Sequence, residues 1–314
     1  MVLVLFSGIV FSEEDDSRGN LSLTFENDIF AFTDRYYTNG VNLDWMIPVG
    51  SFKENKPSSI LHFSLGQVIY TPADITSGQS QGDRPYAGIT FLGAGWEQRF
   101  SSHANLFAAE IGVVGPDSYA RETQEFIHWL FSMKTPRGWE DQLKTGPAVT
   151  LWGSHKRRIA AGNLSRSWSF EVLCHLGGSI GNALSGAAAG MEVRAGFNSK
   201  NTLGSFFIRP GGEGGTLIIE DYAHPSPGQT EDFGLQLFLL ACGRGVLRNV
   251  FLDGPFQQYA SPVEKQNFTG DFVLGVDLQW KKWHFRYAYV YKTRQFVSQP
   301  QGHIIGSLNF GYAW

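Results

Sequence analysis

Residues Phe272–Lys292 read FVLGVDLQWKKWHFRYAYVYK, and their alternation of side chains decides the fold. On the first arm, every second position from Phe272 to Trp280 is apolar, and Asp277 and Gln279 lie on the other parity. A Lys-Lys turn follows, and aromatic residues then take every second position from Trp283 to Tyr291. Such period-two alternation is typical of a strand with one apolar face. The last segment, 304–314, repeats the pattern and closes on tryptophan.

Composition narrows the class of β protein. Charged residues make up 17% of the 314-residue chain, below the usual level of about 25%, and aromatic residues reach 14%. Beyond the first few positions, no apolar run approaches the roughly 18 residues of a membrane-spanning helix. Alternation alone also fits a soluble β-sandwich, but low charge and many aromatics favour a membrane β-barrel. A net charge of −4 gives no support to nucleic-acid binding.

Working backwards along the chain, the same alternation predicts an all-β fold, a 12-stranded antiparallel transmembrane β-barrel over residues 17–314. An even strand number places both termini on the periplasmic side of a bacterial outer membrane. Residues 1–16 are expected to be the remnant of a signal peptide, with a disordered or buried first strand as the alternative. The predicted strands are 20–29, 37–49, 58–70, 86–100, 104–114, 145–157, 167–178, 182–197, 232–252, 264–280, 283–297 and 303–314.

This topology divides the connections between two rims. Segments 30–36, 71–85 and 115–144 are among those predicted to be extracellular, whereas 50–57 and 281–282 are among the short periplasmic turns. The Gly-rich segment 198–231 is too long for such a turn and has no assignment. One short helix, Ala120–Met133, is predicted in the long extracellular loop, because that run lacks Pro and Gly. Its Phe126, Leu130 and Met133 are expected to pack against the barrel.

Three polar clusters fall on the predicted extracellular rim. The first lies in FENDIFAFTDRYYTNG (Phe25–Gly40), a stretch too polar for a core and open to a bland interpretation as a polar hairpin end. The second is Asp83-Arg84, and the third holds Gln124 and His128, four residues apart on one helix face. A histidine can act as a general base near neutral pH. Convergence of these clusters predicts an active site.

Residue chemistry suggests roles within the first cluster. Asp28 could orient the His128 base or hold a cation. Asn27 could donate a hydrogen bond to a developing oxyanion, although alternation puts it on the apolar parity of its strand. The sequence has no Gly-x-Ser-x-Gly motif. Direct attack by an activated water is therefore favoured over an acyl-serine intermediate, which disfavours a serine-dependent barrel phospholipase.

A set of motifs then resembles one known family. In chain order they are FENDIFAFTDRYYTNG, IYTPADI, GDRPYAG, GVVGP, the Gln124–His128 helix leading to GWEDQL, and the closing IIGSLNFGYAW. Together they look like the lipid A 3′-O-deacylase (LpxR-type) family of outer-membrane proteins. The resemblance implies a twelve-stranded barrel in the outer membrane that hydrolyses the 3′-linked acyloxyacyl ester of lipid A. It also implies dependence on a divalent cation, typically Ca²⁺.

The resemblance assigns roles position by position. Asn27 and Asp28 match the family's Asn-Asp pair, Thr38 its hydroxyl residue and His128 its base, with Asp28 as the metal ligand. The substrate-binding residues are expected to be Asp83, Arg84, Gln124 and Lys134. The expected partner is lipid A of the outer leaflet, and the barrel is expected to be a monomer. The sequence departs from the family at Lys134, where a calcium-binding glutamate is expected, and after Tyr70-Thr71-Pro72, where a Lys-Arg pair is missing. Glu26, Glu140 or Asp141 could supply further oxygen ligands.

Two other functions remain open from the sequence. A non-catalytic barrel, acting as a pore or adhesin, would fit the two departures from the family pattern. A barrel phospholipase would differ in its glycerophospholipid substrate. Twelve strands enclose a narrow interior, and inward-facing residues such as Glu97, Arg99 and Arg286 are expected to fill it, which disfavours a wide pore.

Overall fold

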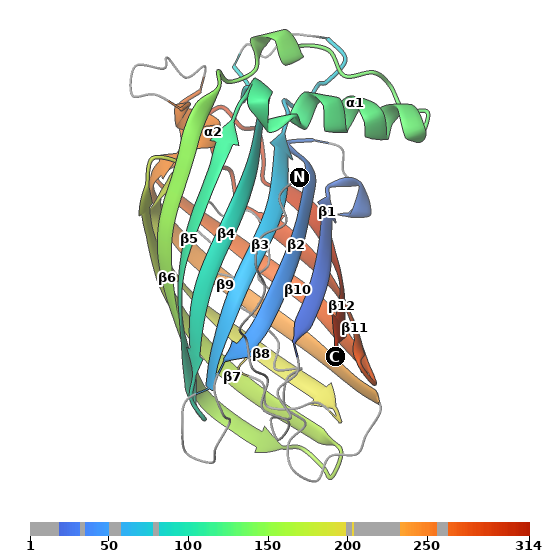
Figure 1. Cartoon of the computed structure of the whole chain (residues 1–314), viewed down its shortest axis with the longest axis vertical. Coiled ribbons are helices and arrows are strands. Elements are labelled where there is room, and N and C mark those ends of the chain that lie inside the picture. Colours follow the sequence, from blue (N-terminus) through green and yellow to red (C-terminus); the bar gives the residue numbers. More distant parts are fainter. Residues whose placement is uncertain are drawn as a thin grey trace, which may run out of the picture.

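The computed structural model describes residues 19–31, 35–49, 58–77, 82–198, 203, 233–255 and 263–314. Twelve antiparallel strands form a closed barrel, in which β1 pairs with β12 and every other pair is consecutive along the chain (Figure 1). The strands are β1 (Asn20–Asn27), β2 (Tyr37–Val49), β3 (Ser58–Tyr70), β4 (Ala87–Arg99), β5 (His103–Val114), β6 (Gly146–Asn163), β7 (Trp168–Gly181), β8 (Leu184–Phe197), β9 (Phe233–Asn249), β10 (Phe268–Trp280), β11 (Trp283–Lys292) and β12 (His303–Ala313).

Each predicted strand corresponds to one of these twelve, and the prediction of a 12-stranded barrel is confirmed. Several of their ends differ, among them those of β6, β9 and β11, and the start of β10, which is Phe268 rather than residue 264. β6 continues past residue 157 to Asn163, because it stays paired with β7 although the polar run HKRR interrupts its apolar alternation. β9 stops at Asn249, whose side chain accepts a hydrogen bond from Phe251 N and caps the short helix α2 (Val250–Asp253). β11 stops at Lys292 rather than at residue 297.

Some predictions lie outside the described residues. They concern residues 1–16, the turn at 50–57, and all of segment 198–231 except Asn198 and Leu203. Leu203 is buried in an apolar cluster with residues of the barrel wall, among them Met46 and Leu173.

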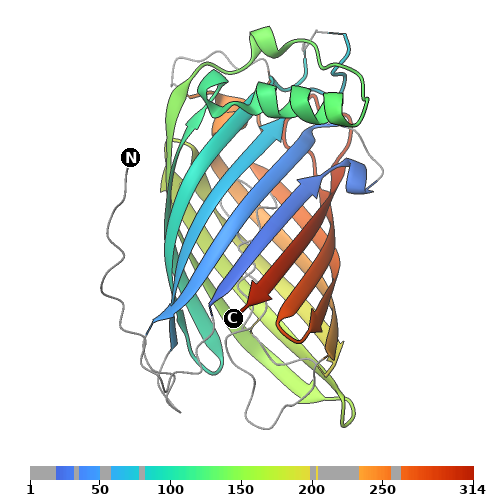
Figure 2. The same ribbon diagram turned by 45° about the vertical axis from the view of Figure 1, so that its right-hand side comes forward.

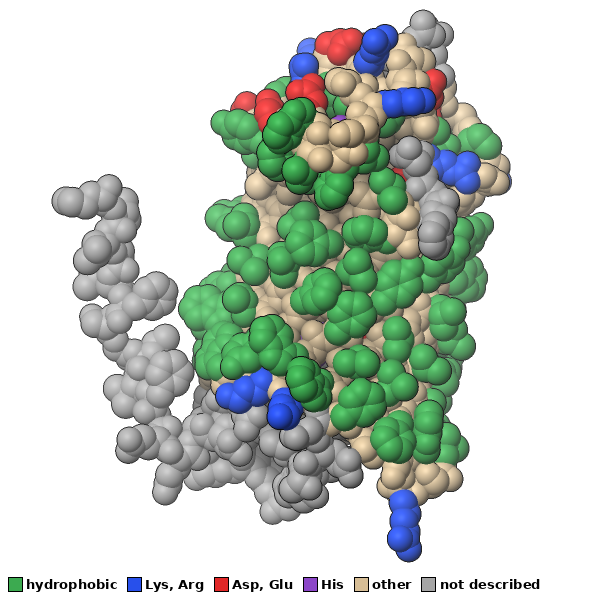
Figure 3. Space-filling model, turned by 90° about the vertical axis from the view of Figure 1, so that its right-hand side faces the viewer, with side chains coloured by type: hydrophobic (Ala, Val, Ile, Leu, Met, Phe, Trp, Pro, Cys, Tyr) green, Lys and Arg blue, Asp and Glu red, His purple; other side chains and the backbone are tan. Residues whose placement is uncertain are grey.

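The strand register produces an apolar outer surface. On β10, Phe272 and Leu274 are about half exposed, whereas the intervening Val273 is buried, and Leu274 lies opposite Tyr289 of β11. Hydrophobic side chains cover the barrel wall as a belt (Figure 3). Among the described residues, no helix is long and apolar enough to cross a membrane.

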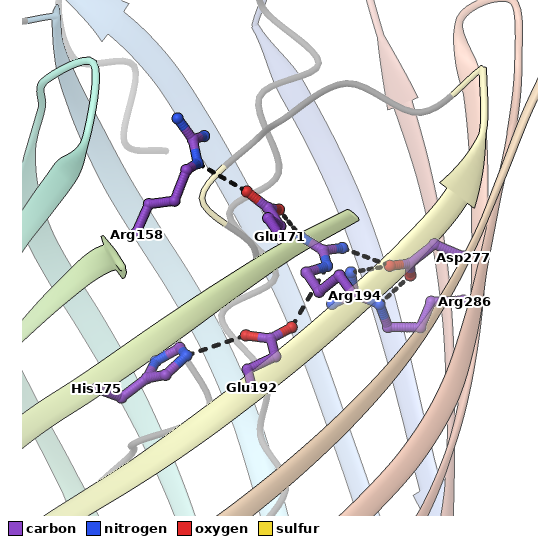
Figure 4. Close-up of polar contacts among 7 residues, drawn as sticks. All are labelled: Arg158, Glu171, His175, Glu192, Arg194, Asp277 and Arg286. Carbon is purple, nitrogen blue, oxygen red and sulfur yellow. Dashed lines mark hydrogen bonds and ion pairs between the residues drawn. The ribbon is translucent and has the colours of Figure 1, made fainter. Parts of the chain in front are cut away.

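Charged side chains of β7, β8, β10 and β11 lie together inside the barrel (Figure 4). Arg194 contacts Glu171 at 3.6 Å, Glu192 at 3.4 Å and Asp277 at 2.8 Å. Asp277 also accepts from Arg286, and Glu192 lies 3.0 Å from His175. A second group joins Glu97 to Arg99 at 2.6 Å and to His62 at 3.2 Å. Glu97, Arg99 and Arg286 therefore point into the lumen, as predicted.

The connections that lead from an odd-numbered strand to the next, even-numbered strand lie at one end of the barrel, called here the upper rim (top of Figure 1). This rim carries α1 (Ala120–Leu130), α2 and the 3-10 helices η1 (Ile29–Ala31), η2 (Pro116–Ser118) and η3 (Trp139–Asp141). β1 begins and β12 ends toward the opposite end, as the two views in Figure 1 and Figure 2 show.

Candidate functional site

All eight predicted site residues lie at the upper rim. Asn27 ends β1, Asp28 follows it, and Thr38 is the second residue of β2. Asp83 and Arg84 precede β4, whereas Gln124, His128 and Lys134 belong to the loop between β5 and β6. The topology therefore brings residues separated by up to 107 positions in sequence to one end of the barrel.

Asn27 holds the connection between β1 and β2. Its Nδ2 donates to the carbonyl of Thr38 at 2.6 Å, and its Oδ1 accepts from Ile29 N at 2.8 Å. Asn27 is the last residue of β1, lies opposite Gly306 of β12 and stays on the outward parity with Phe25, as the alternation predicts. One N–H of the amide remains for a further acceptor.

Asp28 is buried, with 2% of its side chain exposed, directly after β1. Its Oδ2 accepts from Arg35 N at 2.5 Å, and its carbonyl accepts from Ala31 N at 3.0 Å. Neighbouring Glu26 accepts from the Tyr37 hydroxyl at 2.6 Å. The two carboxylates thus hold Arg35 and Tyr37 at the start of β2.

Thr38 sits at an irregularity of the sheet. The pairing of β2 with β3 shifts between Tyr37 and Asn39, so Thr38 has no partner across the ladder. Such a bulge re-aims a side chain relative to its neighbours. The Thr38 hydroxyl contacts the Thr71 hydroxyl at 2.7 Å, and Thr71 also donates to Pro72 O at 3.2 Å. Either hydroxyl can be the donor within the Thr38–Thr71 pair.

Asp83 and Arg84 organise the loop between β3 and β4. The Asp83 carboxylate accepts from two backbone amides, Ala73 N at 2.9 Å and Arg84 N at 2.7 Å. The Arg84 guanidinium is fully buried, stacks 3.6 Å above the Tyr70 ring and donates to Gln295 Oε1 at 3.0 Å. Burial lowers the pKa of Arg84 to about 9, so the group stays charged at neutral pH. Its burial and its hydrogen bond to Gln295 let Arg84 support the loop between β3 and β4.

α1 is anchored on the ends of β3 and β4. Ser118, just before the helix, accepts at its carbonyl from Gln67 Nε2 and Thr90 Oγ1, both at 2.7 Å. A Cβ on Gly88 of β4 would lie 2.0 Å from the Ala120 Cβ, so only glycine permits this close approach. The helix ends at Leu130 instead of Met133, because Ser132 adopts a left-handed conformation with φ 54°.

Gln124 and His128 share the buried face of α1, as predicted from their spacing. Gln124 Oε1 accepts from Trp139 Nε1 at 2.7 Å, which ties α1 to η3. The predicted apolar stripe is wrong in its direction: Phe126 and Leu130 are more than half exposed, and the polar residues face inward.

The His128 ring is oriented by a backbone carbonyl. Its Nδ1 lies 2.5 Å from Lys134 O. A carbonyl can only accept, so Nδ1 carries a proton and Nε2 of the neutral ring is the free acceptor. Lys134 thus contributes through its backbone, while its side chain is exposed. This contact could not be read from the sequence, because any residue type at position 134 supplies the same carbonyl.

The expected Ca²⁺ site finds few ligands in the part of the chain that the structure describes. No group of three His, Cys, Asp or Glu side chains comes together there, whereas Ca²⁺ takes six to eight oxygens. Asp28 and Glu26 both make other hydrogen bonds, and Glu140 is exposed. Among the described residues, acidic side chains alone therefore do not supply the ligands of a calcium site.

Comparison with known proteins identifies the relatives of this barrel. The family model described as "Outer membrane protein LpxR" matches residues 1–314. The chain belongs to the LpxR family. Its members are outer-membrane proteins, so the barrel is an outer-membrane barrel. Family membership supports an outer-membrane lipid A deacylase, the activity that the sequence resemblance implied.

Among solved structures, LpxR from Salmonella typhimurium matches with a TM-score of 0.76 at 21% identity, over 93% of this chain and 99% of that chain. More distant barrels include an outer membrane channel from Pseudomonas putida F1 (TM-score 0.44, 9% identity, 98% of this chain and 100% of that chain). The β domain of the Bordetella autotransporter BrkA follows (TM-score 0.42, 8% identity, 95% and 97%). A search of the curated proteins finds no match to this sequence.

Proposed function

We propose that this LpxR-family barrel hydrolyses the 3′-linked acyloxyacyl ester of lipid A, with His128 as the general base. The observation that carries the proposal is the contact between His128 Nδ1 and Lys134 O, which leaves Nε2 as the proton acceptor. A base that is oriented through its second nitrogen and held on a buried helix face is suited to activating water.

In the proposed reaction, Nε2 takes a proton from water, and the resulting hydroxide adds to the ester carbonyl carbon. The tetrahedral oxyanion then collapses, breaks the bond to the sugar 3′ oxygen and releases the fatty acid. The imidazolium returns its proton to the departing 3′ oxygen. The remaining N–H of Asn27 is the proposed donor to the oxyanion, and the Thr38–Thr71 pair supports that strand end.

Asp28, Asp83 and Arg84 have a positioning role in this proposal. They fix the backbone around Asn27 and the loop that precedes β4. Gln124 positions α1 through Trp139. When bound, Ca²⁺ would polarise the ester carbonyl, and Asp28 is the described residue that the family resemblance assigns to it. No step above depends on the ion.

A wide pore is disfavoured by the buried ion pairs that line the lumen from Glu171 through Arg194 to Asp277 (Figure 4). No comparable observation favours a phospholipase. An assay with glycerophospholipid beside lipid A separates phospholipase activity from lipid A deacylation.

The proposal is tested by mass spectrometry of lipid A from cells that express each variant. We expect His128→Ala to lower 3′-deacylation by about 100-fold or more, the usual contribution of a general base. Glu122→Ala is the matched control, since it changes an exposed residue of the same helix, and it should stay within about twofold of wild type. Unchanged acylation in cells expressing wild type would refute the activity, and equal activity of wild type and His128→Ala would refute the mechanism.

A further inference from the structure

α1 faces the barrel with its polar side and the surroundings with its apolar side. The buried face holds Gln124 and His128, whereas Phe126, Trp129 and Leu130 are 56%, 73% and 53% exposed. Phe131, directly after the helix, is 68% exposed. A helix on a water-exposed surface of a protein has the opposite arrangement, with its apolar stripe against the core.

Two of the three Arg or Glu residues of α1, Arg121 and Glu125, occupy a third side of the helix, whereas exposed Glu122 falls on the apolar side in the first turn. Arg121 and Glu125 form an ion pair at 2.8 Å, and both remain largely exposed. With 100° between successive residues, this pair falls between the buried face and the apolar face. Beyond the first turn, the exposed apolar side of α1 holds no charged residue, and such an apolar side is typical of a helix that lies in a membrane interface.

The apolar side of α1 continues the lipid-facing belt of the barrel. In Figure 3, hydrophobic side chains at the upper rim merge with those of the wall below, and charged side chains lie above them. A second apolar projection is η1, where Ile29 and Phe30 are 43% and 38% exposed. Tyr287 of β11 fixes η1 by donating to Phe30 O at 2.9 Å.

We infer that α1 and η1 are embedded in the outer leaflet, with lipid acyl chains packed against Phe126, Trp129 and Leu130 on one side and Ile29 and Phe30 on the other. The leaflet follows from the topology, because the termini of bacterial barrels lie on the periplasmic side and α1 is at the other end. Exposed aromatic residues at this height match the aromatic girdle of outer-membrane barrels.

This placement determines how a lipid reaches the rim. One face of α1 contacts the acyl chains, and His128 lies on the opposite face. Asn27 lies shortly before η1, two residues ahead of Ile29. A lipid ester can therefore approach sideways from the leaflet, with its chains still in the membrane. The membrane contact itself does not require the proposed esterase activity.

Spin labelling in vesicles tests the inference. Labels are introduced by Phe126→Cys and Trp129→Cys in a background in which the two native free cysteines, Cys174 and Cys242, are replaced by serine. Glu125→Cys, on the charged side of the same helix, is the matched control. Collision with oxygen, which concentrates in lipid, is compared with collision with a water-soluble nickel complex.

We expect the oxygen-to-nickel collision ratio at positions 126 and 129 to exceed that at position 125 by about fivefold or more, with the same result in a His128→Ala background. Equal ratios at all three positions in the folded protein would overturn the inference. Heat-modified migration on gels shows that each labelled barrel is folded. Since the readout needs no turnover, loss of esterase activity and loss of membrane contact remain distinguishable.

Discussion

At the scale of single residues, three side chains of the candidate site are oriented by hydrogen bonds to backbone groups. His128 is oriented by the carbonyl of Lys134, and Asp28 and Asp83 each accept from backbone amides. The sequence could suggest these three side chains as candidates, because histidine and carboxylate groups are common acids and bases in catalysis. The contacts that orient them could not be read from the sequence, since they depend on loop backbone geometry.

Position 134 allows a test of metal dependence. Lys134→Glu restores the carboxylate that the family pattern places there, close to the His128 ring, without changing the orienting carbonyl. We expect deacylation by this variant to rise severalfold with millimolar Ca²⁺ and to fall on addition of a chelator, because carboxylate oxygens are ligands that Ca²⁺ prefers. Lys134→Gln is the control without the charge. The same Ca²⁺ response in both variants and wild type would contradict this expectation.

At the scale of elements, alternation predicts the strands well because each buries one face and exposes the other to lipid. It fails where tertiary pairing overrides local pattern, as in β6 beyond residue 157, which β7 holds in register through His-Lys-Arg-Arg. The face of α1 was mispredicted for a related reason. Apolar residues on a helix normally indicate a core-facing side, but beside a membrane they indicate the lipid.

The docking of α1 on β4 gives a prediction at this scale. We expect Gly88→Ala to lower activity by about tenfold or more, because the added methyl would lie 2.0 Å from Ala120 Cβ and 2.7 Å from Ser118 Oγ. Relieving such overpacking costs about 1–3 kcal/mol and shifts the helix that carries His128. Activity in detergent micelles and gel mobility are measured together. Gly243→Ala is the control, since its Cβ meets no atom within 4 Å, and equal activity of the two variants would rule out a positional role for Gly88.

At the scale of the whole molecule, one barrel performs two separate tasks. Its outer surface is apolar and continuous with the exposed faces of α1 and η1. Its lumen is lined by buried charged side chains, and strand parity predicts that they point inward. Which of them pair across β7, β8, β10 and β11 depends on the register between the strands, which the structure supplies. Because the wall is rigid and closed, the rim elements that it carries are held in fixed relation to the membrane.

The luminal network predicts how the barrel responds to loss of one charge. Asp277 accepts from Arg194 at 2.8 Å and from Arg286 at 2.7 Å, so Asp277→Ala removes the carboxylate shared by two buried guanidinium groups. Breaking buried pairs in this way costs about 3–5 kcal/mol, and we expect the free energy of unfolding in urea to fall by that amount. Glu125→Ala, which removes an exposed i,i+4 partner on α1, should change it by about 0.5 kcal/mol or less. If both variants unfolded at the wild-type urea concentration, the network would fill the lumen without stabilising it.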